Sequence, residues 1–189
     1  MATVPRRFLT AEEYLEAEGK AEYKSEFVNG EVFAKAGASP AHVLAAMNVG
    51  AEIRAQVRRR CPVYGSDMRV HVPAARLYTY PDVSVTCEKP QFADGVPPSL
   101  LNPKLIVEVL SPSREQWDRV VKFRYYQAIP SLEQYLLVSS QRPLLELFTK
   151  SEQGVWTLSE AQGLEATMEL TSVGVKLALA DVYELIEFA

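Results

Sequence analysis

The spacing of apolar and polar residues predicts short helices and strands near the N-terminus. Thr10 and Glu13 have the spacing of a capping box, which predicts that a short helix starts there. Strand-like residues lie on both sides of Asn29-Gly30, the pair most favoured in a tight two-residue turn. We therefore predict a β-hairpin over residues 23–35.

A long helix is predicted after this hairpin. Ser39-Pro40 is the signature of a helix start, with a capping serine and a proline at the first helical position. We expect the helix to reach about Arg60, where Pro62 would end it. Small and apolar residues recur at helical spacing and predict its buried stripe: Leu44, Met47, Ala51 and Ala55.

Apolar runs further along predict the strands of a central sheet. The run 104–110 is apolar almost throughout, which is typical of a strand buried on both faces. A helix is expected between Ser113 and Ile129, and residues 89–103 read as a mobile loop. Short strands follow Gly154, before a last helix capped by Asp181. The predicted strands before Gly154 are 63–72, 80–87, 104–110, 134–139 and 144–149.

This order of elements predicts a mixed α/β (α+β) domain, with a central mixed sheet flanked by helices. The chain has 189 residues, of which 48% are hydrophobic, so we predict a single domain over residues 1–189. No apolar run approaches the ~18–20 residues of a membrane span, and the N-terminus lacks a hydrophobic signal core. We therefore expect a cytoplasmic protein. A net charge of −4 argues against a tight non-specific DNA coat but is compatible with a nuclease.

The cysteines do not suggest a metal site of their own. Cys61 and Cys87 are far apart in the sequence, and with His42 and His71 they make a poor zinc set. We predict that both are reduced cysteines in or near strands.

Two acidic residues stand in apolar strands. Asp82 begins the run Val83 to Val85, and Glu108 interrupts the apolar residues from Leu105 to Leu110. An ionised carboxylate in such a setting is costly unless it is paired or coordinates a metal. Two carboxylates on neighbouring strands would make an oxygen site that suits Mg²⁺ or Mn²⁺.

The helix after Glu108 carries a candidate cation for the same site. Lys122 lies one turn beyond Asp118, so both are on one face of this helix. A lysine aimed at a metal site could position a water molecule or stabilise charge on a phosphorane.

These residues resemble those of the PD-(D/E)XK nuclease superfamily. More narrowly, the chain is similar to the Uma-type proteins, a bacterial family labelled putative restriction endonucleases. The resemblance covers about residues 8–150 in the expected order. The matching segments are NGE at 29–31, SPAH at 39–42, SDMRV at 66–70, YPDV at 80–83, residues 103–113, Asp118-Arg119 with Lys122 and Tyr126, and YLLV at 135–138.

The resemblance implies a restriction-endonuclease-like fold with an N-terminal hairpin and extra C-terminal strands. It matches Asp82 to the aspartate of the PD element and Glu108 to the acid of the (D/E)XK element. The lysine of that element does not match, because Leu110 occupies its place, and the family pattern points to Lys122 instead. Two further acidic positions of the family correspond to Glu31 and Asp67, which could add a metal ligand or hold the site.

Each residue also has a purely structural interpretation. Asp82 could cap a turn, Glu108 could form a structural ion pair, and Lys122 could pair with Asp118 on a solvated face. His42 could be a polar residue at a helix start or a substrate contact. A basic cluster late in the long helix could contact phosphates or offset the helix dipole: Arg54, Arg58, Arg59 and Arg60.

The leading hypothesis is a Mg²⁺- or Mn²⁺-dependent endonuclease that cuts DNA with a metal-activated water molecule. Asp82 and Glu108 would hold the metal, and Lys122 would complete the catalytic set. A homodimer would suit the cutting of two strands. The alternatives are a catalytically inactive DNA- or protein-binding module with the nuclease fold, and a hydrolase of small phosphoesters.

Overall fold

The computed structural model describes residues 8–35, 37–95, 97–112 and 114–188. None of the helices in these ranges has the length and hydropathy to cross a membrane. The helical segments are α1 (Ala11–Glu18), α2 (Pro40–Val57), η1 (Pro73–Ala75), η2 (Trp117–Lys122), α3 (Phe123–Tyr126) and α4 (Leu179–Val182). The strands are β1 (Ser25–Val28), β2 (Glu31–Ala34), β3 (Val63–Gly65), β4 (Val70–Val72), β5 (Leu77–Thr79), β6 (Val83–Val85), β7 (Phe92–Ala93), β8 (Ser99–Leu100), β9 (Leu105–Leu110), β10 (Gln134–Ser139), β11 (Leu144–Lys150), β12 (Trp156–Gln162), β13 (Thr167–Leu170) and β14 (Val175–Ala178).

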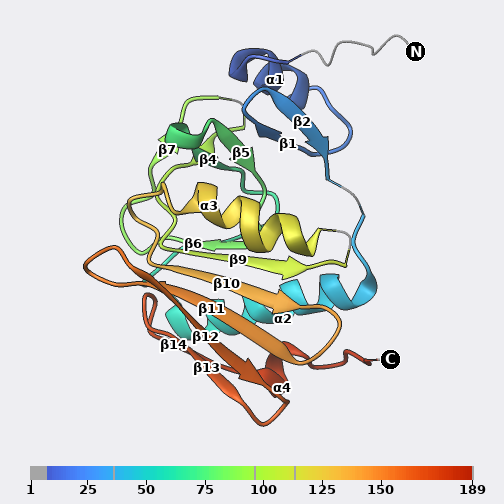
Figure 1. The fold of residues 1–189 in the computed structure, drawn as a ribbon, viewed down its shortest axis with the longest axis vertical. Helices are drawn as coiled ribbons and strands as arrows, with labels where there is room; N and C mark the ends of the chain where they lie inside the picture. The colour runs from blue at the N-terminus through green and yellow to red at the C-terminus, as the bar shows by residue number, and fades with distance from the viewer. Residues whose placement is uncertain (1–7, 36, 96, 113, 189) are drawn as a thin grey trace.

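The strands form a mixed central sheet and a second sheet beside it (Figure 1). The central sheet has the order β12-β11-β10-β9-β6-β3, in which β9 and β10 are parallel and the other neighbours antiparallel. The second sheet has the order β2-β1-β5-β4-β8-β7 and contains the N-terminal hairpin, and β13 and β14 pair separately. The predicted mixed sheet, hairpin and extra C-terminal strands are therefore confirmed.

Local sequence signals explain the N-terminal elements. The Thr10 side chain accepts from the Glu13 backbone N–H, and the Glu13 carboxylate accepts from the Thr10 N–H, which is the predicted capping box. Asn29 and Gly30 have φ values of 49° and 97°, the left-handed pair that a tight hairpin turn requires. Ser39 caps α2 as predicted, with Pro40 at its first position.

Alternation along β9 divides the core between the two faces of the central sheet. Leu105, Val107 and Val109 belong to the core that includes the buried residues of α2. Ile106 and Leu110 belong to the other core, which contains Tyr126 of α3. Because side chains alternate, Glu108 points to the α3 side, away from α2.

The buried stripe of α2 differs from the predicted one. The residues that pack on the sheet are Ala45, Val49, Ile53 and Val57, at a spacing of four. The predicted Met47 is 68% exposed. Periodicity identified the helix, but two apolar faces were available and the branched residues of the other face fill the sheet surface. The other apolar face of α2, which includes Met47, is exposed at the surface.

Two further predictions, one strand and one loop, also need correction. The run 63–72 is not one strand, because residues after Gly65 turn, with the Met68 N–H donating to the Gly65 carbonyl at 3.0 Å. Its two halves, β3 and β4, belong to different sheets. The predicted loop 89–103 contains the short strands β7 and β8.

The helix expected to start at Ser113 is formed by η2 and α3 together. Ser113 itself lies outside the described residues, so its capping role stays a prediction. In η2 the turns widen to π-helical geometry, and Asp118 and Lys122 are its buried residues. The last helix starts at Leu179, two residues before the predicted capping residue Asp181.

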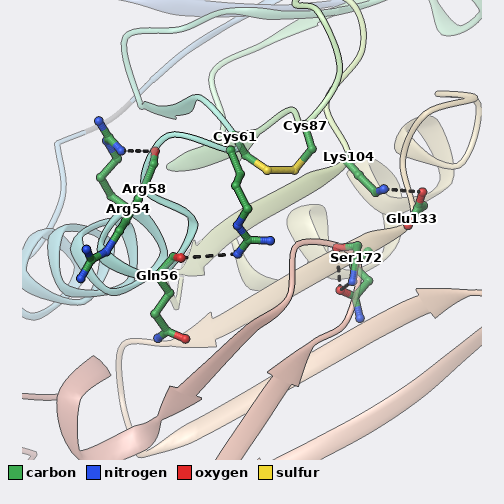
Figure 2. Close-up of a disulfide and its surroundings, with 10 residues drawn as sticks. Arg54, Gln56, Arg58, Cys61, Cys87, Lys104, Glu133 and Ser172 are labelled. Atoms are coloured by element: carbon green, nitrogen blue, oxygen red, sulfur yellow. Dashed lines mark hydrogen bonds and ion pairs between the residues drawn. A yellow bond between two sulfur atoms is a disulfide. The ribbon is translucent and has the colours of Figure 1, made fainter.

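The prediction of reduced cysteines is wrong. Cys61 and Cys87 form a disulfide across a sequence separation of 26 (Figure 2). The segment after α2 returns beside the end of β6, where the Thr86 N–H donates to the Pro62 carbonyl at 3.2 Å. Residues far apart in sequence are therefore adjacent in space, which spacing alone did not indicate.

This disulfide predicts a redox-dependent stability. Closing a loop of this length is worth about 3 kcal/mol by the chain-entropy model. The double variant Cys61→Ser/Cys87→Ser, or the parent in a reductant, is expected to unfold at a lower temperature than the oxidised parent in a thermal melt. A melting temperature that a reductant does not change in the parent would contradict the expectation.

Candidate active site

The register of β6 and β9 brings Asp82 and Glu108 together. These strands are antiparallel, with Val83 opposite Val107, so the next position along places Asp82 opposite Glu108. The Asp82 Oδ2 accepts a hydrogen bond from the Val109 backbone N–H at 2.8 Å. Asp82 is 7% exposed and Glu108 is 3% exposed. The two acids predicted from the sequence thus form one buried pair.

Lys122 reaches this pair from η2 and joins three carboxylates. Its Nζ lies 2.9 Å from Glu26 Oε1, 3.0 Å from Glu108 Oε1 and 3.1 Å from Asp118 Oδ1. Lys122 donates a hydrogen bond to Glu108, and its contacts with Glu26 and Asp118 are ion pairs. The side chain of Lys122 is 4% exposed. Lys122 therefore holds the carboxylates together in this structure.

Glu26 is a member of the site that the sequence analysis missed. It is 1% exposed on β1, and its Oε1 accepts from the Thr79 hydroxyl at 2.6 Å. Its Oε2 lies 2.9 Å from Nη1 of Arg114. The signal that could have found it is the one that identified Glu108, an acid in the middle of a strand. The predicted hairpin included Glu26 but did not indicate which face of the sheet Glu26 occupies.

Glu108 is held on a third side by Tyr126, whose hydroxyl donates to Glu108 Oε1 at 2.8 Å. Burial raises the pKa of Glu108 to about 8, and the negative charges of Asp118, Asp82 and Glu26 add to this rise against the opposing effect of Lys122. Burial likewise raises the pKa of Asp118, although Lys122 opposes the rise. This part of the site holds more negative charge than its single lysine neutralises.

The pKa values of the other two carboxylates, Glu26 and Asp82, are shifted downwards. Burial alone would raise the pKa of Glu26, but the charge of Lys122 and the Thr79 hydrogen bond outweigh it and lower that pKa. Burial would also raise the pKa of Asp82, but His42, Lys35 and the Val109 N–H together lower that pKa. The pKa values of Asp82 and Glu26 are therefore shifted downwards, whereas those of Glu108 and Asp118 are shifted upwards.

A cavity of about 250 Å³ opens onto these groups. Lys35 lies in its wall, with Nζ 3.5 Å from Asp82 Oδ1 and donating to the Tyr80 carbonyl at 2.6 Å. His42 Nε2 lies 3.4 Å from Asp82 Oδ2. Among the described side chains, four carboxylates and three cations meet here: Glu26, Asp82, Glu108 and Asp118 with Lys35, Lys122 and Arg114.

Comparison with known proteins now gives the family. The model of the Uma2 family, described as putative restriction endonuclease, matches residues 11–180. The chain belongs to this family. Two uncharacterised proteins of Synechocystis are 37% and 34% identical to it, over 90% and 95% of this chain and 97% and 94% of theirs. A crystal structure of a putative nuclease of the DUF820 group from Anabaena variabilis superposes with a TM-score of 0.76 at 15% identity, covering 95% of this chain and 99% of the other.

The fold of this Uma2 protein is thus restriction-endonuclease-like, as predicted. The two further acids that the resemblance matched are Glu31 and Asp67. Asp67 forms an ion pair with Lys24, and its side chain is 92% exposed. The described residues that line the cavity include neither Asp67 nor Glu31. We therefore keep both outside the ligand set proposed below.

Three arginines of the basic cluster donate to carbonyls at the C-terminal end of α2. The guanidinium of Arg54 donates to the Arg58 carbonyl, as Figure 2 shows. Arg58 donates to the Ala55 carbonyl at 3.3 Å, and Arg60 to the Gln56 carbonyl at 3.4 Å. These contacts satisfy carbonyls that a helix C-terminus leaves open, so the helix-dipole interpretation is favoured for Arg58 and Arg60.

The donor set fits a hard divalent cation of the Mg²⁺ kind. Within the described residues, no three His, Cys, Asp or Glu side chains form a cage for a metal ion. Mg²⁺ does not need such a cage, because it is usually bound by one or two carboxylates together with water and substrate phosphate. Asp82 and Glu108 supply two oxygen donors, and such a cation would compensate the negative charge of Glu108, which burial and the neighbouring carboxylates disfavour.

The raised pKa of Glu108 predicts the effect of Glu108→Gln on stability. The folded pKa of Glu108 lies above its ordinary value of 4.5, so its ionisation costs stability that grows as the pH rises from about 4.5 to about 8. Glutamine keeps an oxygen acceptor for Tyr126 and Lys122 without the charge. In a chelator at pH 8, Glu108→Gln is expected to be more stable than the parent by about 1–3 kcal/mol.

Denaturant unfolding of both proteins at pH 5 and pH 8 measures this difference. The advantage of the variant should be small at pH 5 and larger at pH 8. An advantage that is absent at pH 8, or equal at the two pH values, would contradict the electrostatic assignment.

Proposed function

We propose that this protein is a Mg²⁺- or Mn²⁺-dependent endonuclease that hydrolyses phosphodiester bonds of DNA. The observation that carries the proposal is the register that sets Asp82 opposite Glu108 at the wall of the cavity. Membership of a family described as putative restriction endonuclease supports the same reaction class. A cytoplasmic location and a homodimer that cuts both strands are part of this proposal.

A bound divalent cation would polarise the scissile phosphate and lower the pKa of an attacking water molecule. Asp82 and Glu108 would hold it, with the Val109 carbonyl as a third donor. Asp82 is already oriented by the Val109 N–H. Ionised Glu108 is required for this role, and a nearby divalent charge would lower its raised pKa.

The cations of the site have separate roles in this proposal. Lys122 donates to Glu108 and forms ion pairs with Glu26 and Asp118, so it positions Glu108 and offsets charge. Orienting the attacking water would require one of these contacts to open. Lys35 is 26% exposed in the cavity wall and is the lysine placed to meet a substrate phosphate.

The alternative is a catalytically inactive module with the nuclease fold that binds DNA or protein. One observation favours it. Lys122, the residue matched to the catalytic lysine, is fully engaged by buried carboxylates instead of facing the cavity freely. Such a module would bind DNA without cutting it.

A nicking assay on supercoiled plasmid separates these functions. The parent is expected to produce nicked circles with Mg²⁺ or Mn²⁺ and none in excess chelator. An identically purified Glu108→Gln preparation controls for contaminating nucleases. Plasmid that stays intact with every metal but shifts in a gel would overturn the nuclease proposal and favour the binding module.

A further inference from the structure

A second and larger hollow adjoins the candidate active site. It has a volume of about 520 Å³ and runs along the exposed face of α2 beside β3. Four residues line both this groove and the smaller cavity: Lys35, Ala38, His42 and Asp82. The groove is therefore continuous with the place where the scissile phosphate would lie.

Small residues leave the groove open. Gly50 of α2 and Gly65 of β3 both line it, and a Cβ added at Gly50 would meet only the Val83 side chain, at 3.5 Å. Val43 and Met47 line the groove while being 53% and 68% exposed. Both side chains lie on the face of α2 that does not pack on the sheet. The groove thus offers an apolar surface to something outside the described chain.

Positive charge stands at both ends of this apolar surface. Lys35 lies at the end shared with the active site, and Arg54 lines the other end. His42 and Arg54 are 54 − 42 = 12 residues apart on one helix. At about 1.5 Å per residue this is roughly 18 Å, enough for a short stretch of nucleotides. An apolar surface between two cations is complementary to a nucleotide strand, whose bases are flat and apolar and whose phosphates are negative.

We propose that this groove binds unpaired bases of the strand that enters the active site, so that the substrate is single-stranded or locally unpaired DNA. The inference rests on the proposed nuclease function and specifies its substrate class. Bases inside a duplex are stacked and paired, and their faces cannot reach the groove without being extruded.

A blocking variant tests the groove directly. Gly50→Leu fills it with a side chain, and leucine has a higher helix propensity than glycine, so α2 should still form. Ala55→Leu adds a leucine to an exposed position of the same helix, and Ala55 is not among the described residues that line the groove. Cleavage is measured on a fluorescein-labelled single-stranded oligonucleotide and on the same strand in a matched duplex, with Mn²⁺.

The parent is expected to cut the single strand at least about 10-fold faster than the duplex, since stacking contacts of this kind are worth about 1–3 kcal/mol per base. Gly50→Leu should lose about 10-fold in single-strand cleavage, and Ala55→Leu should match the parent. Equal cleavage of both substrates, or a Gly50→Leu rate equal to that of Ala55→Leu, would overturn the groove assignment while leaving the nuclease proposal intact.

A binding measurement in chelator, where no cleavage occurs, distinguishes failure of the groove proposal from failure of the nuclease proposal. Fluorescence anisotropy in chelator measures the affinity of the same labelled strand for each protein. If the parent cuts neither substrate, the nuclease proposal fails, yet weaker binding by Gly50→Leu than by Ala55→Leu still supports the groove. Equal binding by both variants refutes it in that case as well.

Discussion

Glu108→Gln is expected to lower plasmid nicking by at least about 100-fold, because loss of a group that supports transition-state charge typically costs 10²–10³ in rate. The variant keeps the shape of the side chain and an acceptor for the Tyr126 hydroxyl, now 2.8 Å from Oε1. It removes only the charge that a divalent cation needs. Since the same variant should be more stable in chelator, a loss of activity would not come from unfolding.

A matched control strengthens this test. Glu146 is a second buried acid of the central sheet, 6% exposed and paired with Arg119. It is not among the described residues that line the active-site cavity. Glu146→Gln should therefore retain nicking within about 5-fold, an effect of about 1 kcal/mol. Nicking by Glu108→Gln at the rate of Glu146→Gln would mean that Glu108 has no role in the chemistry.

Lys122→Met is expected to lower the free energy of unfolding by about 3–5 kcal/mol, the usual cost of removing one partner of a buried charge pair. Methionine fills a similar volume but leaves Glu26, Glu108 and Asp118 without their shared cation. Each lies within 3.1 Å of the lysine Nζ in the folded protein. Chemical denaturation in chelator at pH 8 measures the loss.

A second variant shows whether the loss is electrostatic. Lys122→Met/Glu26→Gln removes one cation and one carboxylate, so the net charge of the cluster is the same as in the parent. It should recover at least about 1 kcal/mol relative to Lys122→Met. If the double variant is as unstable as the sum of the two single changes, packing and not charge explains the role of Lys122.

The sequence predicted best what depends on neighbouring residues. The capping box at Thr10 and the Asn29-Gly30 turn use contacts within a few residues, and both are present. Asp82 and Glu108 were identified because a carboxylate inside an apolar strand needs a partner whatever the fold. Lys122 was predicted from its position one turn after Asp118 and from the family pattern, and it lies 3.0 Å from Glu108.

What depends on distant residues was predicted poorly. Choosing between the two apolar faces of α2 requires knowing which face meets the sheet, so the exposed Met47 was expected to be buried. Pairing Cys61 with Cys87 requires the return of the chain beside β6. Glu26 belongs to the site only because β1 pairs with β5, which carries its hydrogen-bond partner Thr79.

The most direct measurement is a calorimetric titration of the parent and of Asp82→Asn with Mn²⁺. Asparagine keeps an oxygen that can accept from the Val109 N–H, so the variant should preserve the local backbone while losing a charged ligand. The parent is expected to bind Mn²⁺, and Asp82→Asn to bind it at least about 10-fold more weakly. A parent that shows no binding, or a variant that binds as tightly as the parent, would contradict a metal site formed by Asp82 and Glu108.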